Sequence, residues 1–315
     1  MNDLSPIVLF VYNRPEHTKR TIESLSKNNL SSESFLYVYS DAPKDLKDQA
    51  SVDQVRHYLH SINPTYFKKI LVTERENNLG LANSIISGVS EVVHKHGKVI
   101  VLEDDIVTGK SFLTFMNSAL DFYYDKKKVW HVSGWNYPIE HKGLSDVFIW
   151  RGMECWGWAT WADRWKNFNN NIEYTVGSFS KKDISFLNLD NSRNVWRQVI
   201  ENRVGKIDTW AIFWFTTISK NKGMSVNITK SLTQNIGIDG TGHNCDDDDI
   251  YRLDDSAYLE QEAYLEQEMD FEFEKDLEES KLAVERIKAF YKHSRGSIAT
   301  RIVRKLKKII SIYFS

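Results

Sequence analysis

Cysteine is scarce in this sequence, with Cys155 and Cys245 the two examples among 315 residues. Two cysteines do not make a disulfide framework, and their spacing does not suggest a zinc site. We therefore expect the protein to work in a reducing compartment, the cytoplasm. The chain opens without a basic segment, an apolar stretch and a small-residue cleavage site, so we do not expect it to be secreted.

Long apolar runs are also absent, since no stretch approaches the roughly 18 uninterrupted apolar residues of a membrane-spanning helix. The formal net charge of −2 hides an acidic segment at 246–279 and a basic segment at 295–308 that contains no acid. Apolar residues recur at helical spacing within 297–314, opposite basic side chains. We predict a helix that binds an anionic membrane surface at the inner face of the cell membrane. A helix packed against the protein has the same pattern and remains an alternative.

Short apolar runs alternate with helical segments in the first half of the chain. The predicted strands are 6–12, 35–40, 69–73, 98–102 and 129–133, and the predicted helices are 81–95 and 110–124. This alternation predicts an α/β fold with a doubly wound, mostly parallel sheet. Ligands bind such sheets beyond the carboxyl ends of the strands, so the polar residues that follow the strands should gather there. These residues are Arg14, Asp41, Asn78, Gly80 and the acids at 103–105.

We expect one main domain at residues 1–245, a solvated acidic helical appendage at 246–290 and a basic amphipathic tail at 291–315. The glycine-rich segment 235–244 is a candidate mobile lid over the main domain.

Three acids, Glu103, Asp104 and Asp105, directly follow the apolar strand at 99–102. Attachment to a buried strand fixes them at the edge of the sheet. Carboxylate oxygens are ligands that Mg²⁺ and Mn²⁺ prefer, so the cluster predicts a divalent cation site. Acids are also common between a strand and a helix as turn or cap residues, and the sequence leaves both interpretations open.

The sequence motifs resemble a known enzyme family when they are taken in order. They are Asn13-Arg14, Ser40-Asp41, residues 78–80, VIVLEDD at 99–105, VSGWN at 132–136, GWATW at 157–161 and DTW at 208–210. The set is similar to the GT-A fold glycosyltransferases of the broad family 2 type, over about residues 5–245. It is most similar to the branch that contains N-acetylglucosaminyltransferase I, whose metal motif is also Glu-Asp-Asp. The resemblance implies a GT-A fold and an inverting transfer of a sugar from a nucleotide diphosphate sugar, with UDP as the nucleotide.

The resemblance also implies roles for single residues. Asp105 would bind Mn²⁺ or Mg²⁺ directly, while Glu103 and Asp104 would bind hydroxyls of the ribose or the donor sugar. Asp41 would face the base, and Arg14 the base or the diphosphate. Asn78 and Gly80 would belong to the same donor-binding edge. Asp41 could equally be an Asx-turn residue, and Arg14 an exposed turn residue.

An inverting transfer needs a general base that removes the proton from the acceptor hydroxyl. In the resembling family this base is an acid next to a Trp at the start of a helix. Asp208 occupies that place, ahead of a helix that we predict at 209–221, although this chain has Asp-Thr-Trp where the relative has Asp-Trp. Helix capping is the alternative role for Asp208, and Glu154 is the second candidate for the base.

Aromatic side chains can bind the apolar face of a sugar, and this chain has ten tryptophans. We predict that Trp156 or Trp158, in a Trp-rich turn, forms a wall of the acceptor site. His243 in the glycine-rich segment would complete the metal site or contact the diphosphate, although a single loop histidine is often idle.

The predicted partners are a nucleotide-sugar donor, a saccharide or lipid-linked saccharide acceptor and an anionic membrane, without a nucleic acid. Surface polysaccharide synthesis would explain the basic tail, and the transferred group would be a hexose or an N-acetylhexosamine. A sugar- or nucleotide-binding module without turnover is an alternative. A nucleotidyltransferase is another, but its glycine-rich basic loop is missing after the first strand, where the sequence reads VYNRP.

Overall fold

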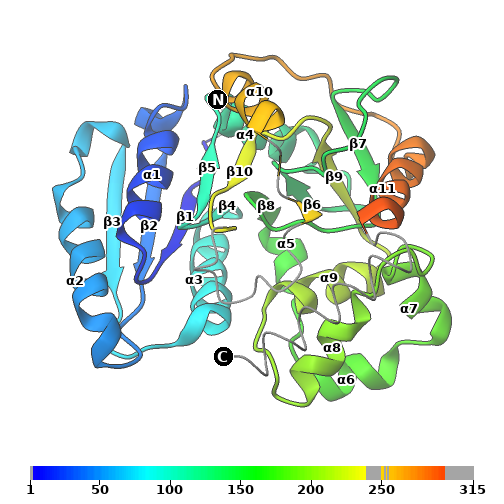
Figure 1. Ribbon diagram of the computed structural model, residues 1–315, viewed down its shortest axis with the longest axis horizontal. Helices are drawn as coiled ribbons and strands as arrows, with labels where there is room; N and C mark the ends of the chain where they lie inside the picture. Colours follow the sequence, from blue (N-terminus) through cyan, green and yellow to red (C-terminus); the bar gives the residue numbers. More distant parts are fainter. Residues whose placement is uncertain (1–2, 239–249, 252, 254, 295–315) are drawn as a thin grey trace.

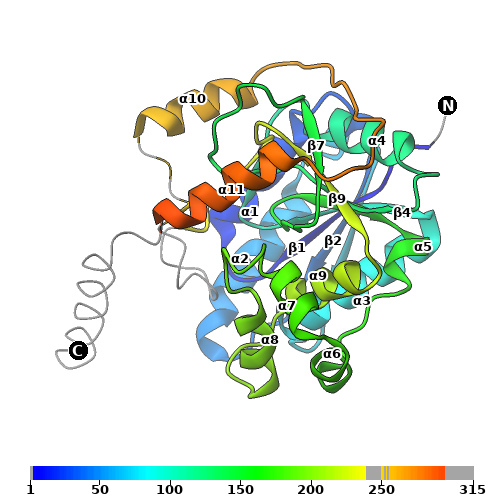
Figure 2. The ribbon, with the colours of Figure 1, turned by 90° about the vertical axis from the view of Figure 1, so that its right-hand side faces the viewer.

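The computed structural model of the protein describes residues 3–238, 250–251, 253 and 255–294 (Figure 1, Figure 2). His243, Cys245, most of the glycine-rich segment and the tail from residue 295 lie outside these residues. The predictions made for them therefore stay predictions.

Eight strands form the central sheet in the order β3-β2-β1-β4-β8-β6-β9-β7. The strands are β1 (Ile7–Val11), β2 (Phe35–Ser40), β3 (Lys69–Glu74), β4 (Lys98–Glu103), β6 (Val129–Ser133), β7 (Val147–Trp150), β8 (Trp158–Trp161) and β9 (Met224–Ile228). The first four run parallel, as do β6 and β9, while β8 is antiparallel to β4 and β6, and β7 is antiparallel to β9. The predicted α/β fold with a mostly parallel sheet is confirmed.

Helices cover both faces of this sheet (Figure 1). Side chains alternate along β1, so Ile7 and Leu9 pack with α1 (Pro15–Ser26), α2 (Leu46–Ser61) and α4 (Phe112–Phe122). Val8 and Phe10 point to the other face and pack with α3 (Gly80–His96) and α9 (Ala211–Lys220). Both sides of β1 are buried, which explains its continuous run of apolar residues.

Several shorter elements complete the fold. They are the helices α5 (Ala162–Trp165), α6 (Ile172–Ser178), α7 (Lys181–Leu187), α8 (Trp196–Arg203), α10 (Asp255–Leu265) and α11 (Lys281–Ser294), 3-10 turns at Ser31–Glu33 and Pro64–Tyr66, and the antiparallel pair β5 (Ile106–Thr108) and β10 (Thr233–Asn235). Figure 1 places α6 to α9 together beside the sheet and α10 at the end opposite α6. Among the described residues, no helix is long and apolar enough to cross a membrane.

Residues Trp158–Trp161 of the GWATW segment form a strand in the middle of the sheet, and the expectation of a turn there is wrong. Strand β8 lies between β4 and β6. Alternation sends Trp158 to the face of α3 and α9, and Trp161 to the face of α4. Both rings are completely buried, so two large aromatic residues fill the core on opposite sides of one short strand.

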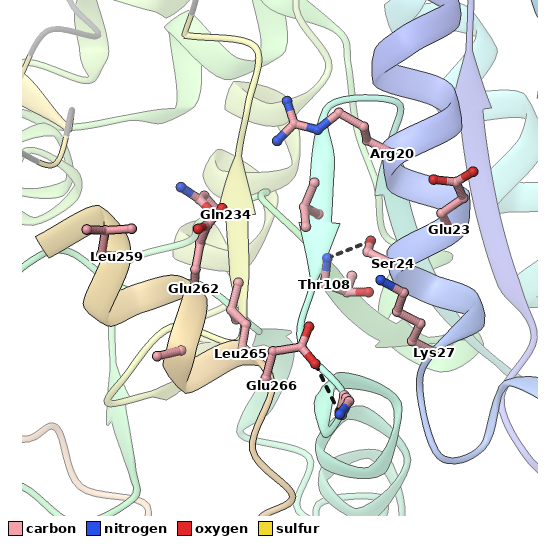
Figure 3. A pocket seen from close by; sticks show the side chains of 13 residues that line it. Arg20, Glu23, Ser24, Lys27, Thr108, Gln234, Leu259, Glu262, Leu265 and Glu266 are labelled. Carbon is pink, nitrogen blue, oxygen red and sulfur yellow. Dashed lines mark hydrogen bonds and ion pairs between the residues drawn. The ribbon is translucent and has the colours of Figure 1, made fainter. Parts of the chain in front are cut away.

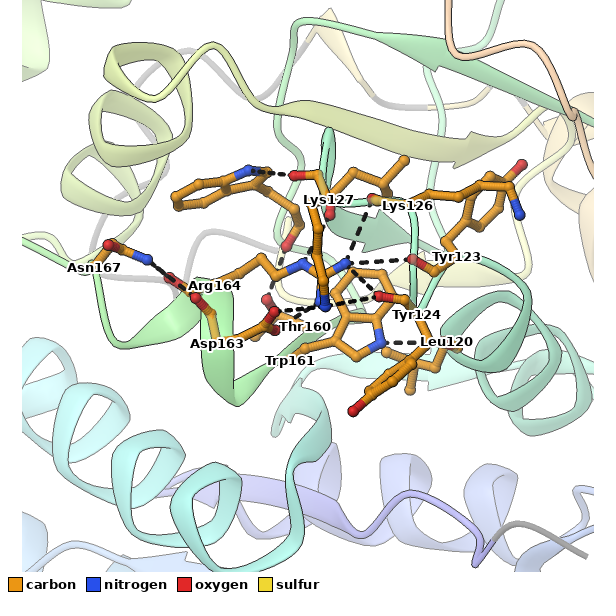
Figure 4. Close-up of polar contacts among 12 residues, drawn as sticks. Leu120, Tyr123, Tyr124, Lys126, Lys127, Thr160, Trp161, Asp163, Arg164 and Asn167 are labelled. Carbon is orange, nitrogen blue, oxygen red and sulfur yellow. Dashed lines mark hydrogen bonds and ion pairs between the residues drawn. The ribbon is translucent and has the colours of Figure 1, made fainter.

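Arg164 of α5 is buried beneath the turn that connects α4 to β6 (Figure 4). Its Nη2 atom donates to the carbonyl of Tyr124 at 2.8 Å and its Nε atom to the carbonyl of Val129 at 3.2 Å. Its Nη1 atom pairs with Asp163 at 2.6 Å. The guanidinium thus satisfies main-chain carbonyls at a place where the turn has no strand to pair with.

Two helices, α10 and α11, lie in the segment after residue 255, with an irregular stretch at 266–280 between them. The expectation that this segment is a solvated appendage is wrong. Residues 269–277 cross the α4 face, where Phe273 stacks on Phe122 with ring centroids 5.4 Å apart. Helix α11 then buries Ala283, Val284, Ile287 and Tyr291 against the edge of the sheet near β7. The acidic composition reflects the exposed side of these elements, while their apolar side belongs to the core of the domain.

Candidate functional site

The sheet changes its direction of growth at β1. After β1 the chain adds β2 and β3 on one side, and then returns to place β4 on the other side. Ligands of open α/β sheets bind beyond the carboxyl ends of the strands at such a switch point. Arg14 follows β1 at this position, and Glu103 ends β4 beside it, since Phe10 pairs with Glu103. The topology therefore brings two of the predicted site residues, Arg14 and Glu103, to the same edge of the sheet.

Arg14 forms ion pairs with the acidic cluster, which is Glu103, Asp104 and Asp105. Its Nη2 atom contacts the carboxylate of Asp104 and lies 3.0 Å from Asp105 Oδ2. The main-chain oxygen of Asp104 accepts a hydrogen bond from the Thr21 hydroxyl of α1 at 2.8 Å. The start of α1 and its first turns thus hold the acids in place.

Burial and repulsion among the acids shift their protonation. Burial, then the charges of Asp105 and Asp104, raise the pKa of Glu103 to about 8, although Arg14 and a hydrogen bond from Trp210 oppose this rise. Burial also raises the pKa of Asp104 to about 6 against the opposing charge of Arg14. Burial lowers the pKa of Arg14, but the two aspartates outweigh it and keep that pKa above its ordinary value. One guanidinium does not balance the cluster, so another cation would be attracted.

Asp105 is the acid of this cluster best placed to bind a metal ion. Its side chain is 14% exposed, against 5% for Asp104. The chain passes over it at Gly237, where a Cβ would collide with the carboxylate. Within the described ranges, no group of three or more His, Cys, Asp or Glu side chains surrounds a metal position. The residues present fit a cation that binds through Asp105 and takes its other ligands from water or phosphate oxygens, as Mg²⁺ commonly does.

Asp41 binds main-chain groups at the start of α3. Its carboxylate accepts hydrogen bonds from the N–H groups of Leu79 at 2.9 Å and Gly80 at 3.0 Å, and from Ala42 at 3.0 Å. Asn78 donates to the carbonyl of Ala42 at 2.6 Å. An acid at a helix N-terminus is stabilised by the unpaired N–H groups there. The carboxylate therefore holds the start of α3 against the end of β2, and its predicted contact with the base stays a prediction.

Asp208 lies exposed in the loop before α9. The helix begins at Ala211 with Trp210 as its N-cap residue, so the alternative that Asp208 caps the helix is wrong. Trp210 is 3% exposed and stacks on Trp158 with ring centroids 5.1 Å apart. Its side chain lowers the pKa of Glu103, so the indole lies close to that acid. The buried indole therefore anchors the Asp208 loop close to the acidic cluster.

Glu154 lies just before β8, at the edge of the sheet where β4 ends, because β8 is antiparallel to β4. The neighbouring Cys155 is a free thiol. Burial raises the pKa of Cys155 well above its ordinary value, and the charges of Glu103, Glu154 and Asp105 add to the rise. Glu154 therefore shares one acidic neighbourhood with the predicted metal ligand.

The two tryptophans predicted for the acceptor wall behave differently. Trp158 is completely buried between α9 and His131, so its prediction as an acceptor wall is wrong. Trp156 is half-buried at the sheet edge and packs edge-on against Trp135, with ring centroids 4.5 Å apart. Its role in acceptor binding stays a prediction.

A buried polar cluster around Arg193, Tyr137 and Tyr291 was not predicted from the sequence. These residues are 9%, 1% and 8% exposed, and Arg193 pairs with Glu154 at 3.2 Å. They come from three separate segments of the chain, and none belongs to a recognisable motif. The richness in tyrosine was the one available sign of such a cluster.

A separate groove of about 550 Å³ lies between α1, the β5–β10 pair and α10 (Figure 3). Arg20 and Lys27 line it from α1, and Glu266, just after α10, pairs with Lys110 at 3.0 Å. Neither Arg14 nor the acidic cluster lines this groove. It is therefore distinct from the site at the switch point.

No protein-family model matches the sequence, and no curated protein matches it either. Solved structures that match include S. aureus TarS, at 16% identity over 38% of this chain, with a TM-score of 0.29. S. aureus TarS 1-349 matches 74% of this chain at 10% identity and a TM-score of 0.42. The chain spans 20% and 61% of those two chains. The galactosyltransferase LgtC, in complex with donor and acceptor sugar analogs, matches 70% of this chain and 72% of its own at 10% identity and a TM-score of 0.38. Similarity this low establishes no shared activity.

Proposed function

We propose that this protein is a metal-dependent, inverting glycosyltransferase of the GT-A type that uses a nucleotide diphosphate sugar. The observation that carries this proposal is the acidic cluster with Arg14 at the switch point of the sheet. A site with surplus carboxylates and one guanidinium suits a polyanionic ligand that arrives with a divalent cation. The resemblance of the motifs to family 2 enzymes supports the same conclusion from the sequence.

On the donor side, Asp105 would bind Mn²⁺ or Mg²⁺, which neutralises the charge that grows on a departing diphosphate. Arg14 would turn from the acids toward the diphosphate oxygens and contribute a second positive charge. Glu103 and Asp104 would accept hydrogen bonds from sugar hydroxyls. Asp41 would shape this side by holding the start of α3 against the end of β2.

On the acceptor side, Asp208 would accept the proton of the acceptor hydroxyl as its oxygen bonds to the anomeric carbon. The bond between that carbon and the diphosphate oxygen breaks on the opposite face, and its electron pair leaves with the diphosphate. Asp208 is exposed, and the buried Trp210 fixes its loop beside the acids, which supports this role. His243 in the metal site remains a proposal from the sequence.

We further propose UDP as the nucleotide, a hexose or N-acetylhexosamine as the sugar, and a saccharide or lipid-linked saccharide as the acceptor. Synthesis of a surface polysaccharide at the inner face of the membrane would unite these partners with the basic tail. Membrane binding by the tail is supported by its sequence pattern, because residues 295–315 lie outside the described residues.

A screen of nucleotide sugars for Mn²⁺- or Mg²⁺-dependent thermal stabilisation, followed by hydrolysis assays on the hits, tests this function. We expect at least one UDP-sugar to stabilise the wild type and to be hydrolysed slowly. Asp105→Ala should abolish the part of the thermal stabilisation that depends on the metal ion. Asp53→Ala, on the exposed side of α2, is the matched control and should leave it unchanged.

Normal metal-dependent binding in a folded Asp105→Ala protein would exclude Asp105 as the metal ligand. Stabilisation of the wild type without hydrolysis of any hit would instead favour the binding-module alternative. The absence of any nucleotide-sugar response in the wild type would end the proposal.

A further inference from the structure

Glu154 is held in place through one of its two carboxylate oxygens. Its Oε1 atom accepts a hydrogen bond from the hydroxyl of Tyr137 and lies 3.2 Å from Arg193 Nη1. The same arginine nitrogen lies 2.8 Å from the hydroxyl of Tyr137. Arg193 is buried, so its charge is not screened by water and binds Glu154 tightly.

Helix α11 closes this arrangement from the C-terminal part of the chain. The hydroxyl of Tyr291 donates to that of Tyr137 at 2.8 Å and lies 3.2 Å from Arg193 Nη1. Tyr251 adds a contact at 3.2 Å between its hydroxyl and that of Tyr291. We call Arg193, Tyr137 and Tyr291 the Glu154 clamp.

The main chain of Glu154 is fixed as well. Trp214 donates a hydrogen bond from its indole to His131 Nδ1 at 3.2 Å, so the ring proton of His131 is on Nε2. That Nε2 group lies 3.0 Å from the main-chain oxygen of Glu154 and donates to it. Both ends of the residue are therefore anchored, which a side chain with a purely space-filling role would not require.

The second oxygen, Oε2, is left for a ligand. In the described part of the chain no group hydrogen-bonds to it, and it is not among the buried atoms that lack a partner. The Glu154 side chain is 18% exposed, so this oxygen reaches solvent. The half-buried ring of Trp156 packs against Tyr251 with ring centroids 5.5 Å apart, and Tyr251 contacts Tyr291 of the clamp. The acidic cluster shares the neighbourhood of Cys155.

A fixed, solvent-facing carboxylate oxygen beside an aromatic ring is suited to a neutral ligand with many hydroxyl groups, because the hydroxyls donate to the oxygen and the apolar face lies on the ring. An anionic ligand that brings no cation would be repelled by Glu154 and by the acidic cluster. The chemistry therefore favours an uncharged saccharide at this place.

We infer that Glu154 is an anchor for the acceptor saccharide, in which Oε2 accepts a hydrogen bond from a sugar hydroxyl and Tyr291 is a positioning residue that completes the clamp. This inference rests on the proposed function and gives its acceptor side a defined residue. It also makes α11 part of the site, although that helix is far from the acidic cluster in the sequence.

Binding of neutral glycosides by saturation-transfer NMR tests the inference. The probes are methyl α- and β-glycosides of glucose, galactose and N-acetylglucosamine, each measured with and without UDP and Mg²⁺. We expect at least one to bind the wild type, and Glu154→Gln to weaken that binding by roughly 10- to 100-fold, the range for losing a hydrogen bond to a charged group. Binding of UDP and Mg²⁺ should stay unchanged in this variant.

Tyr291→Phe removes the clamp hydroxyl without removing Glu154. We expect it to weaken glycoside binding by roughly 3- to 10-fold, in line with one lost neutral hydrogen bond. Tyr123→Phe is the matched control, because that buried hydroxyl donates to the carbonyl of Glu274 at 2.9 Å and has no link to Glu154. It should reduce stability similarly and leave glycoside binding unchanged.

Equal glycoside binding by the wild type and Glu154→Gln would overturn the anchor, and so would the absence of any glycoside binding by the wild type. Equal losses in Tyr291→Phe and Tyr123→Phe would show that α11 has only a structural role and overturn the positioning claim. If UDP fails to bind while glycoside binding still depends on Glu154, the anchor stands and the proposed donor is wrong.

Discussion

The two halves of the central sheet differ in their buried charged groups. In the half formed by β3, β2, β1 and β4, the buried charged groups are the acids Asp41 and Asp104, and backbone N–H groups or Arg14 bind them. In the half formed by β8, β6, β9 and β7, buried Arg164 and Arg193 donate to oxygen atoms of the surrounding chain.

Under the proposed function, this difference assigns a separate ligand to each half. The first half presents carboxylates and suits a cation with a polyanion. The second half presents aromatic rings, the fixed carboxylate of Glu154 and the exposed Asp208, which suit a neutral sugar and the removal of its proton. Under the proposed function, the first half is the donor side and the second half is the acceptor side.

The largest expected effect is on turnover. Asp208→Asn keeps the size of the side chain but cannot accept a proton, so we expect transfer to fall by roughly 10² to 10⁴. Affinity for the donor, measured by calorimetry, should stay near that of the wild type because the donor side is unchanged. If transfer persists in Asp208→Asn while Glu154→Gln is inactive, the base is Glu154.

The next effect concerns the stability of the second half. Arg164→Met should lower the free energy of unfolding by about 3 to 5 kcal/mol, because several buried carbonyl oxygens lose their donor. Urea unfolding measures this loss. Arg197→Met changes an arginine whose side chain is 56% exposed, and it should cost less than about 1 kcal/mol. Similar losses in the two variants would contradict the role given to Arg164.

A third effect is a pH dependence that originates in the second half. Burial lowers the pKa of His131 from 6.5 to about 4, so the unfolded state binds the proton first as the pH falls. The stability that comes from the neutral ring is complete above pH 6.5 and is lost as the pH falls toward 4. This loss amounts to about 2 kcal/mol between pH 7 and pH 4.5.

Urea unfolding of the wild type and His131→Gln at both pH values measures this contribution. The difference between the two pH values should be smaller in the variant by about 2 kcal/mol. His60→Gln, which changes a mostly exposed histidine, is the control and should leave the difference close to that of the wild type. The same difference in all three proteins would exclude His131 as the source.

The smallest effect belongs to the first half. Gly80 has a φ of +74° with no atom within 4 Å of an added Cβ, so Gly80→Ala is strained by its backbone alone. We expect it to destabilise the protein by about 1 kcal/mol. Gly177→Ala has the same open space without a positive φ and should be neutral or slightly stabilising. Equal thermal shifts for both variants would contradict the explanation.

The first half of the fold was predictable because its signals are local. Strands β1 to β4 are continuous apolar runs ended by polar residues, and the prediction placed each within about one residue of its observed ends. Strand β8 was missed because four residues with two tryptophans fit a turn, a helix or a strand equally well. Strand β8 forms because it pairs with β4 and β6 on either side. A local sequence pattern does not predict such pairing with distant strands.

The sequence by itself determined the alternation of strands and helices, and therefore the edge at which Arg14, Asp41 and the acidic cluster gather. This follows because a buried strand and an amphipathic helix each impose a period on the residues that form them. Only the tertiary structure decided that Arg14 pairs with Asp104 and Asp105, that Trp158 is buried, and that Tyr291 of α11 binds Arg193. These contacts join segments far apart in the chain, so they depend on how the elements pack and leave no period in the sequence.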